Sequence, residues 1–121
     1  MKITKARILN FPDAGNLTID PKGLELPEGP IPVTFGSAGT FDNAVGTAVL
    51  TKTDDGVDAD IDLVSMAVVQ ELVSGPRNLY PAIGAIILER VGTKISKCTA
   101  NRVVISVERN EDSTIQPLPK K

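Results

Sequence analysis

Strict alternation of apolar and acidic side chains over residues 57–63, VDADIDL, is the feature that most constrains how this chain can fold. Successive side chains of a β-strand point to opposite faces, so the apolar residues share one face and the three aspartates share the other. Residues 45–51 form a second strand-like run, and Asp55-Gly56 lies in the connection between the two. An Asp-Gly pair tolerates the positive φ of a tight hairpin turn. The sequence therefore predicts a β-hairpin with one apolar and one acidic face.

Similar runs, separated by turns that contain proline and glycine, predict further strands elsewhere in the chain. These strands cover residues 2–10, 17–19, 31–35, 80–90, 94–98 and 102–109. Apolar residues at helical spacing predict one short helix at 65–73. The expected fold class is all-β, built mainly of antiparallel strands in a barrel or sandwich, with at most one short helix and extended termini.

The length of 121 residues fits one domain with a single core. We expect a β-rich domain over residues 1–109. Within it, residues 24–32 hold three prolines, each lacking a backbone donor, which predicts an extended connector at a sheet edge or over the surface. Residues 110–121 are polar and contain proline, so they are predicted to form an extended C-terminal tail rather than packed structure.

The chain has no histidine and only one cysteine, Cys98. The side chains that most often move protons near neutral pH, activate nucleophiles or hold transition metals are therefore missing. No Gly-x-Ser-x-Gly, Ser-x-x-Lys or phosphate-binding glycine motif occurs either. We expect no enzymatic activity and no cofactor, and we expect Cys98 to be a small buried hydrophobic residue. An unusual hydrolase is the enzymatic alternative, and it would need a reactive serine.

Charge and aromatic content restrict the class of partner. The formal net charge is −2, aromatic residues make up 3% of the chain, and its 13 lysines and arginines form no tract. Counterion release needs a concentrated basic face and base stacking needs aromatic rings, so nucleic acid is not expected as a partner. No apolar stretch reaches the roughly 20 residues that span a bilayer, and the first residues lack the apolar core of a signal peptide, so we expect no membrane role.

The predicted hairpin carries five aspartates between residues 54 and 62. Calcium takes several oxygen ligands, but an EF-hand loop counted from Asp54 would need glycine sixth and glutamate twelfth, whereas Gly56 comes third and Ser65 twelfth. We expect a solvated sheet face, with a basic protein partner or a bound cation as alternatives. Tyr80-Pro81 has two interpretations, because a tyrosine ring fits either the start of a strand or a contact with a partner.

Short motifs in a fixed order carry a resemblance to a known class of proteins. They are LPxxPIPVTF at 26–35, VGTA at 45–48, DDGVxAxI at 54–61, YPAIG at 80–84, and VISV at 104–107 followed by NxD at 110–112. In this order, over residues 30–112, the chain resembles small capsid-associated proteins of tailed bacteriophages. The same order is also similar to the β-rich core of phage prohead proteases. Those enzymes use a serine with a histidine, and because this chain has no histidine the catalytic role does not carry over.

The resemblance implies a capsid decoration, or cement, protein that binds the outer surface of an icosahedral phage capsid and stabilises contacts between capsomers. The implied partner is the major capsid protein, and the implied location is the virion surface after assembly in the host cytoplasm, which a single cysteine fits because no disulfide is needed. A homo-oligomer, with a trimer favoured, is expected. Predicted contact residues are Lys2, Lys5, Arg7, Tyr80, Pro81, Ile115, Pro117, Leu118 and Pro119. A tail or neck component of the same particles and a small-ligand-binding β-barrel are the alternative functions.

Overall fold

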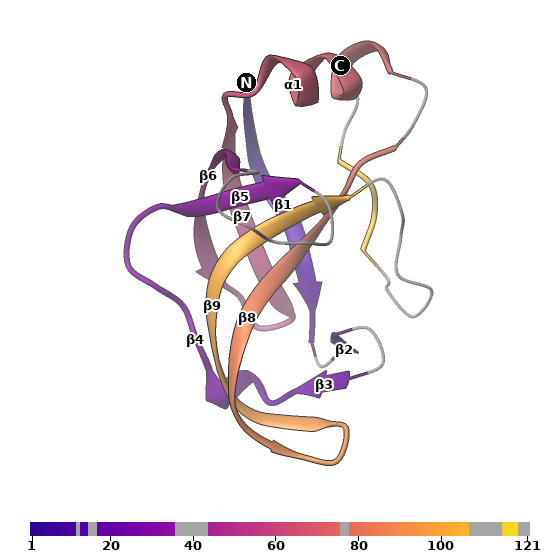
Figure 1. Ribbon diagram of the computed structural model, residues 1–121. Coiled ribbons are helices and arrows are strands. Elements are labelled where there is room, and N and C mark those ends of the chain that lie inside the picture. The colour runs from indigo at the N-terminus through magenta and orange to yellow at the C-terminus, as the bar shows by residue number, and fades with distance from the viewer. Residues whose placement is uncertain (12, 15–16, 36–43, 76–77, 107–114, 119–121) are drawn as a thin grey trace.

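A computed structural model describes residues 1–11, 13–14, 17–35, 44–75, 78–106 and 115–118. Strands dominate it, with one α-helix and one short 3-10 helix (Figure 1). In chain order the elements are β1 (Lys2–Asn10), β2 (Asp13–Ala14), β3 (Leu17–Ile19), η1 (Pro21–Gly23), β4 (Leu24–Glu25), β5 (Ile31–Phe35), β6 (Ala44–Lys52), β7 (Gly56–Leu63), α1 (Met66–Ser74), β8 (Tyr80–Val91) and β9 (Lys94–Ser106).

The nine strands form one mixed sheet, whose main order is β3-β2-β1-β7-β6-β5-β9-β4, with β8 paired to β9 outside this order. Six pairings are antiparallel. The other three are parallel and join β3, β4 and β5 to β9. The link between β3 and β9 consists of two residue pairs, and the sheet is not closed into a barrel. The predicted all-β class with mainly antiparallel strands and one short helix is confirmed.

The β6–β7 hairpin forms as predicted, with Gly46 opposite Leu63 at one end and Lys52 opposite Val57 at the other. The apolar residues of β7 are buried, and its aspartates lie on the opposite face. The prediction that the Asp55-Gly56 turn uses a positive φ at the glycine is wrong, because the φ of Gly56 is not positive. A Cβ on Gly56 would collide with the carbonyl oxygen of Leu9, so close approach of β1 requires glycine there.

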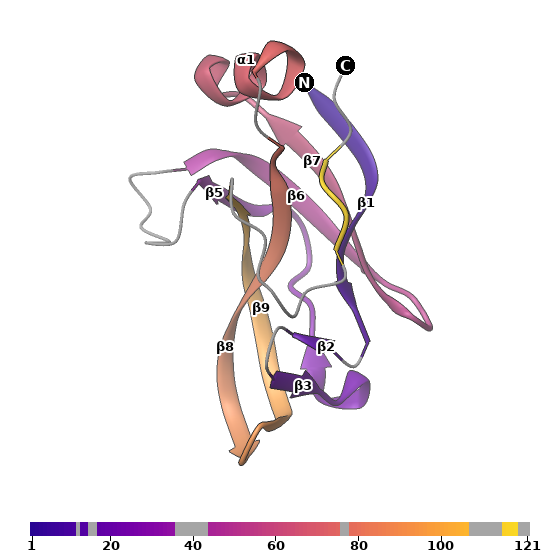
Figure 2. The ribbon, with the colours of Figure 1, turned by 90° about the vertical axis from the view of Figure 1, so that its right-hand side faces the viewer.

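Two strands predicted at 94–98 and 102–109 are one strand, β9, over the residues that the structure describes. The predicted break is absorbed by a bulge, since Gly84 of β8 lies opposite Arg102 and Ala85 lies opposite Ala100. Residues 107–109 of the second predicted strand lie outside the described part of the chain. Figure 2 shows β8 and β9 as a long curved ribbon that extends away from α1.

The proline-containing connector at 24–32 begins with β4, which is the last strand in the main order of the sheet. Leu24 lies opposite Cys98 and Glu25 opposite Thr99, both in parallel register. The predicted position at a sheet edge is therefore confirmed for the start of the connector.

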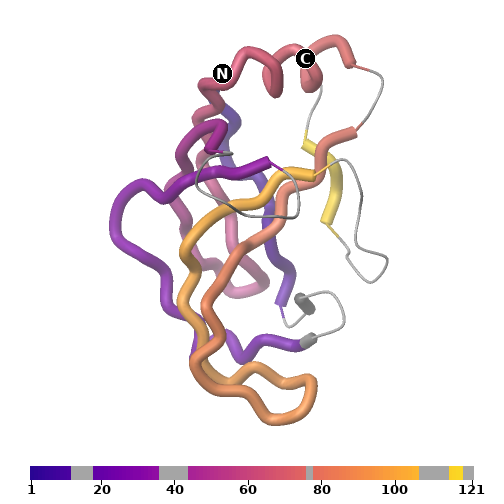
Figure 3. Tube along the Cα trace, in the orientation of Figure 1, coloured from indigo at the N-terminus to yellow at the C-terminus, as the bar shows by residue number. Residues whose placement is uncertain are grey.

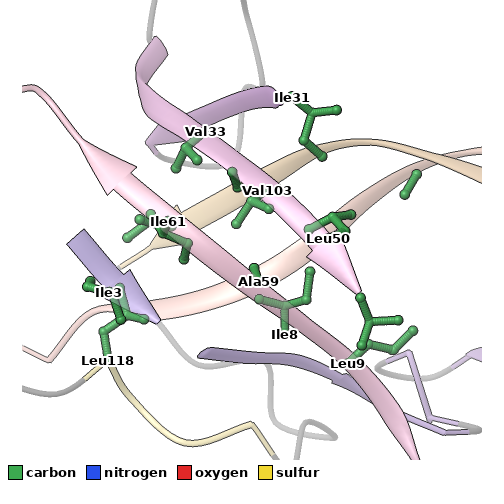
Figure 4. Packing of buried hydrophobic residues seen from close by; sticks show 14 of the residues in the cluster. Ile3, Ile8, Leu9, Ile31, Val33, Leu50, Ala59, Ile61, Val103 and Leu118 are labelled. Carbon is green, nitrogen blue, oxygen red and sulfur yellow. The ribbon is translucent and has the colours of Figure 1, made fainter. Parts of the chain in front are cut away.

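Buried side chains from most of the sheet form one core (Figure 4). The labelled residues in this view come from β1, β5, β6, β7, β9 and the segment 115–118. Cys98 belongs to the same cluster and is fully buried, as predicted. Loss of contact with water raises the pKa of its thiol above the ordinary 9.0, and the charge of nearby Lys52 only partly opposes this.

The C-terminal segment differs from the expected extended tail. Ile115 and Leu118 are buried, and the backbone N–H of Leu118 donates to the carbonyl oxygen of Leu79 at 2.7 Å. Figure 3 shows this segment, in yellow, beside the start of β8. Two apolar residues among polar and proline neighbours are enough to hold the segment on the sheet, because each removes apolar surface from water. Ile115 and Leu118 are therefore buried positions of the fold and not the exposed contact residues that were expected.

Leu118→Ala is expected to lower the free energy of unfolding by about 2–4 kcal/mol, because it leaves a cavity in the core. Gln116→Ala, at an exposed neighbouring position, should change it by less than about 0.5 kcal/mol. Urea denaturation of both variants measures the difference. Equal unfolding midpoints would show that residues 115–118 do not pack on the sheet.

The Cys98 thiol is expected to react with a disulfide reagent such as DTNB far more slowly in the native protein than in the urea-unfolded chain. Burial both blocks access and disfavours the reactive thiolate. Absorbance at the released thionitrobenzoate band follows the reaction. Comparable rates in the folded and unfolded protein would contradict the burial of Cys98.

Candidate partner-binding surface

Three of the predicted contact residues, Lys2, Lys5 and Arg7, lie on β1, which pairs antiparallel with β7. Lys2 lies opposite Asp62, and Arg7 lies opposite Asp58. Cross-strand neighbours of opposite charge stabilise a pair of strands, and this register places basic residues of β1 beside acidic residues of β7.

Lys5 adopts a left-handed backbone conformation with φ of 52°. It lies within a register shift between Ile3 and Ala6, and its backbone N–H donates to Asp60 Oδ1 at 2.9 Å. A non-glycine residue at positive φ costs of order 1–2 kcal/mol, and such strain concentrates at functional sites. The Lys5 side chain is exposed, and within the described part of the chain its ammonium group makes no ion pair. The bulge therefore presents an uncompensated positive charge to solvent.

Arg7 is the centre of a charged network on the outer side of the hairpin. Its Nε donates to Asp58 Oδ1 at 2.7 Å, and its two terminal nitrogens each lie 3.2 Å from Asp55 Oδ1. Asp55 Oδ1 also accepts a hydrogen bond from Thr53 Oγ1 at 2.9 Å. The Thr53 hydrogen bond and the adjacent Arg7 guanidinium hold the pKa of Asp55 below its ordinary 3.8. The Arg7 guanidinium is therefore bound by aspartates of its own chain, which largely neutralise its charge.

The aspartates on the acidic face of β7 make contacts within the chain, whereas we expected a solvated surface. Asp58 binds Arg7, Asp60 accepts the Lys5 backbone N–H, and Asp62 lies 3.8 Å from the N-terminal amino group. Within the residues that the structure describes, no three His, Cys, Asp or Glu side chains gather as metal ligands do. Among the described residues, Asp58 is the aspartate of this face that pairs with a charged side chain of β1, namely Arg7.

A hollow of about 400 Å³ lies between β1, the start of β8 and the C-terminal segment. It brings together five of the nine predicted contact residues from three distant parts of the sequence. These are Lys5, Arg7, Pro81, Pro117 and Leu118. Because Pro81 and Leu118 are buried, they contribute the floor of the hollow, while Lys5 reaches solvent at its rim.

The other predicted residues lie elsewhere or are not described. Lys2 lines a second hollow of about 310 Å³, which crosses β1, β7 and β6. Tyr80 is half-buried at the first position of β8, opposite Ser106, which agrees with its interpretation as the start of a strand. Ile115 is buried, and Pro119 lies outside the described residues.

Sequence reasoning missed an exposed apolar cluster at the free end of β8. Its members are Ile86, Ile87, Leu88 and Val91. A continuous apolar run normally indicates a strand that is covered on both faces, so the pattern gave no reason to expect exposure. The only local signal is the charged pair Glu89-Arg90 that interrupts the run.

Comparisons with protein-family models, with curated proteins and with solved structures find no match to this chain. Among the described residues there is no helix whose length and apolarity would let it cross a bilayer.

Arg7→Gln is expected to lower the free energy of unfolding by about 1 kcal/mol, because it removes charge-assisted hydrogen bonds to two aspartates at a partly exposed site. Lys22→Gln, at an exposed position in η1, is the matched control and should leave stability unchanged. Chemical denaturation at neutral pH compares the two. Identical midpoints would mean that the network adds nothing to stability.

The Asp55 contacts also predict a pH dependence. Since folding lowers the pKa of Asp55, its contribution is fully present above the unfolded value of 3.8 and is lost as the pH falls through the lower folded value. Asp55→Asn should therefore be less stable than wild type near neutral pH, and the gap should close in strong acid. Urea unfolding over a pH series tests this, and a gap that stays constant with pH would contradict it.

Proposed function

We propose that this protein is a structural virion protein that binds the outer surface of an icosahedral phage capsid through the hollow between β1, β8 and residues 115–118. The observation that carries this proposal is the meeting of Lys5, Pro81 and Pro117 around one recess. The sequence predicts each of them as a contact residue, and they come from segments that are far apart in the chain. The capsid as partner is supported by the sequence resemblance to capsid-associated proteins.

The rim and floor of the hollow suggest what it binds. Lys5 offers an exposed ammonium group, and the half-buried Pro117 offers rigid apolar surface that loses little entropy on contact. An acidic residue flanked by apolar ones, on a loop of the major capsid protein, has the complementary chemistry. The site itself is held by the sheet and by the packed C-terminal segment, so little ordering is needed before binding.

A role in adhesion rather than catalysis agrees with the side chains present. The chain has no histidine, and its single thiol is buried with a raised pKa. A cement protein needs neither group. Each copy can bind weakly, because many copies on one shell, or several sites on one oligomer, convert weak contacts into high total affinity.

The proposal is tested by mixing the purified protein with capsids that were assembled without it from the major capsid protein of the same genome, and by counting the copies that sediment with the shells. Saturable binding is expected, and Lys5→Glu should weaken it by about tenfold, since reversal of one interfacial charge is worth about 1.4 kcal/mol. Lys22→Glu, at another exposed lysine, in η1, is the matched control.

Protein that never sediments with shells would overturn the capsid assignment, and association with purified tails instead would favour the tail alternative. Equal binding of Lys5→Glu and Lys22→Glu would place the contact away from the hollow.

A further inference from the structure

The ribbon formed by β8 and β9 carries a positive charge that the chain as a whole does not have. These two strands contain four basic residues and one acidic residue, a net charge of +3 in a chain whose formal net charge is −2. The acidic residue, Glu89, lies opposite Lys97, whereas Arg90, Lys94 and Arg102 lie opposite uncharged residues. Within the described part of the chain, no ion pair involves the ribbon. It therefore presents net positive charge to a partner.

Arg102 differs from the other basic residues of the ribbon because it is partly buried and lies across β8. A Cβ on Gly84, the residue opposite, would lie 2.5 Å from Arg102 Cγ, so glycine is needed for the arginine to take this path. Arg102 Nε is buried and has no hydrogen-bond partner. A guanidinium that has lost water without gaining a carboxylate is stabilised when a partner supplies one.

The strand that Arg102 crosses has a free edge. β8 pairs with β9 along one edge, and no strand of the described residues pairs with its other edge. Figures 1 and 2 show the free end of this hairpin at the end of the molecule away from α1. Toward that end Ile86 and Leu88 are more than half exposed, and Val91 is 77% exposed. An unpaired edge presents backbone donors and acceptors, and exposed apolar side chains beside it favour the addition of a strand.

A partner for this surface has to supply backbone hydrogen bonds, apolar contacts and negative charge together. An anionic membrane lacks the first of these, since hydrocarbon leaves the backbone groups of an open strand edge unsatisfied. Nucleic acid binding favours exposed aromatic rings, and the single ring of the two strands, Tyr80, is half-buried. An extended protein segment that alternates apolar and acidic residues supplies all three.

We propose that the free edge of β8 binds such a segment of a partner protein as an added strand, and that a carboxylate of the segment pairs with Arg102. Complementary charge selects an acidic segment, and the exposed apolar side chains of β8 contact its apolar ones. This contact is separate from the proposed capsid contact beside β1 and does not depend on it.

Fluorescence anisotropy with a labelled synthetic peptide, TVEVEVEVT, tests the proposal on the full chain. Saturable binding is expected, and the peptide with lysine in place of each glutamate should bind more weakly by at least about tenfold. Arg102→Gln should weaken binding of the glutamate peptide by about tenfold, because it removes a charge-assisted contact. Lys2→Gln, which removes an exposed positive charge from β1, is the matched control and should bind like wild type.

Gly84→Ala tests the position of the arginine separately from its charge. It leaves every charge in place, but its Cβ would collide with Arg102 Cγ and displace that side chain. Binding should therefore weaken as it does in Arg102→Gln, while circular dichroism shows that both variants are folded. Binding that neither variant weakens would overturn the role of Arg102.

A matched pair of apolar substitutions tests the edge without changing any charge. Val91→Ser should weaken peptide binding, whereas Val64→Ser, at an apolar side chain of similar exposure, 71%, near α1, should not. In NMR spectra of the labelled protein, the amides of residues 84–91 should shift and exchange more slowly when the peptide binds. Shifts confined to β1 and residues 115–118 would place the peptide in the hollow and overturn the proposal.

Failure of the glutamate peptide to bind would also overturn it. Capture of the protein by vesicles of phosphatidylcholine and phosphatidylglycerol would then assign this surface to a membrane. Self-association that Val91→Ser abolishes would instead assign it to a second copy of the chain.

Discussion

Pairing of β9 along both of its edges is the constraint on which the rest of the structure depends. One edge of this strand runs beside β8 for nearly its whole length, and the other meets β3, β4 and β5 in turn. These contacts tie segments from the first third of the chain to segments from the last third. Cys98, Val103 and Ile105 of β9 are fully buried as a result, and they anchor the core that the hairpins cover. The hollow beside β1 forms because the pairing of β8 with β9 brings the start of β8 next to β1.

Local patterns predicted the elements whose residues carry their own periodicity. The alternation in β7 predicted its pairing with β6 and its buried face, and the bounds predicted for β1 and β3 are those observed. The helix predicted at 65–73 is observed one residue later, as Met66–Ser74. In each case the information lies within about ten neighbouring residues, since hydrophobic period and turn chemistry act locally.

Features that depend on distant partners could not be predicted in the same way. Nothing in the local pattern of residues 94–106 says that three short strands will pair with them in parallel register. The burial of Ile115 and Leu118 depends on an open position beside Leu79, and the local composition of the segment suggests exposure instead. The left-handed conformation of Lys5 follows from the bulge in the pairing of β1 with β7. Lysine itself does not favour this backbone conformation. For the same reason, the sequence predicted several residues of the candidate site but did not predict the ion pairs that Arg7 makes.

The hollow beside β1 and the free edge of β8 both belong to one sheet. Around β1, Arg7 pairs with Asp55 and Asp58, whereas the exposed Lys5 ammonium group makes no ion pair within the described part of the chain. At the opposite end β8 leaves an edge and four apolar side chains uncovered. Native-state hydrogen exchange measured by NMR tests the role of β9 most directly. Its amides between residues 98 and 105 should exchange slowest in the protein, and only through global unfolding. Exchange of these amides by local opening, at rates like those of the free edge of β8, would contradict the account.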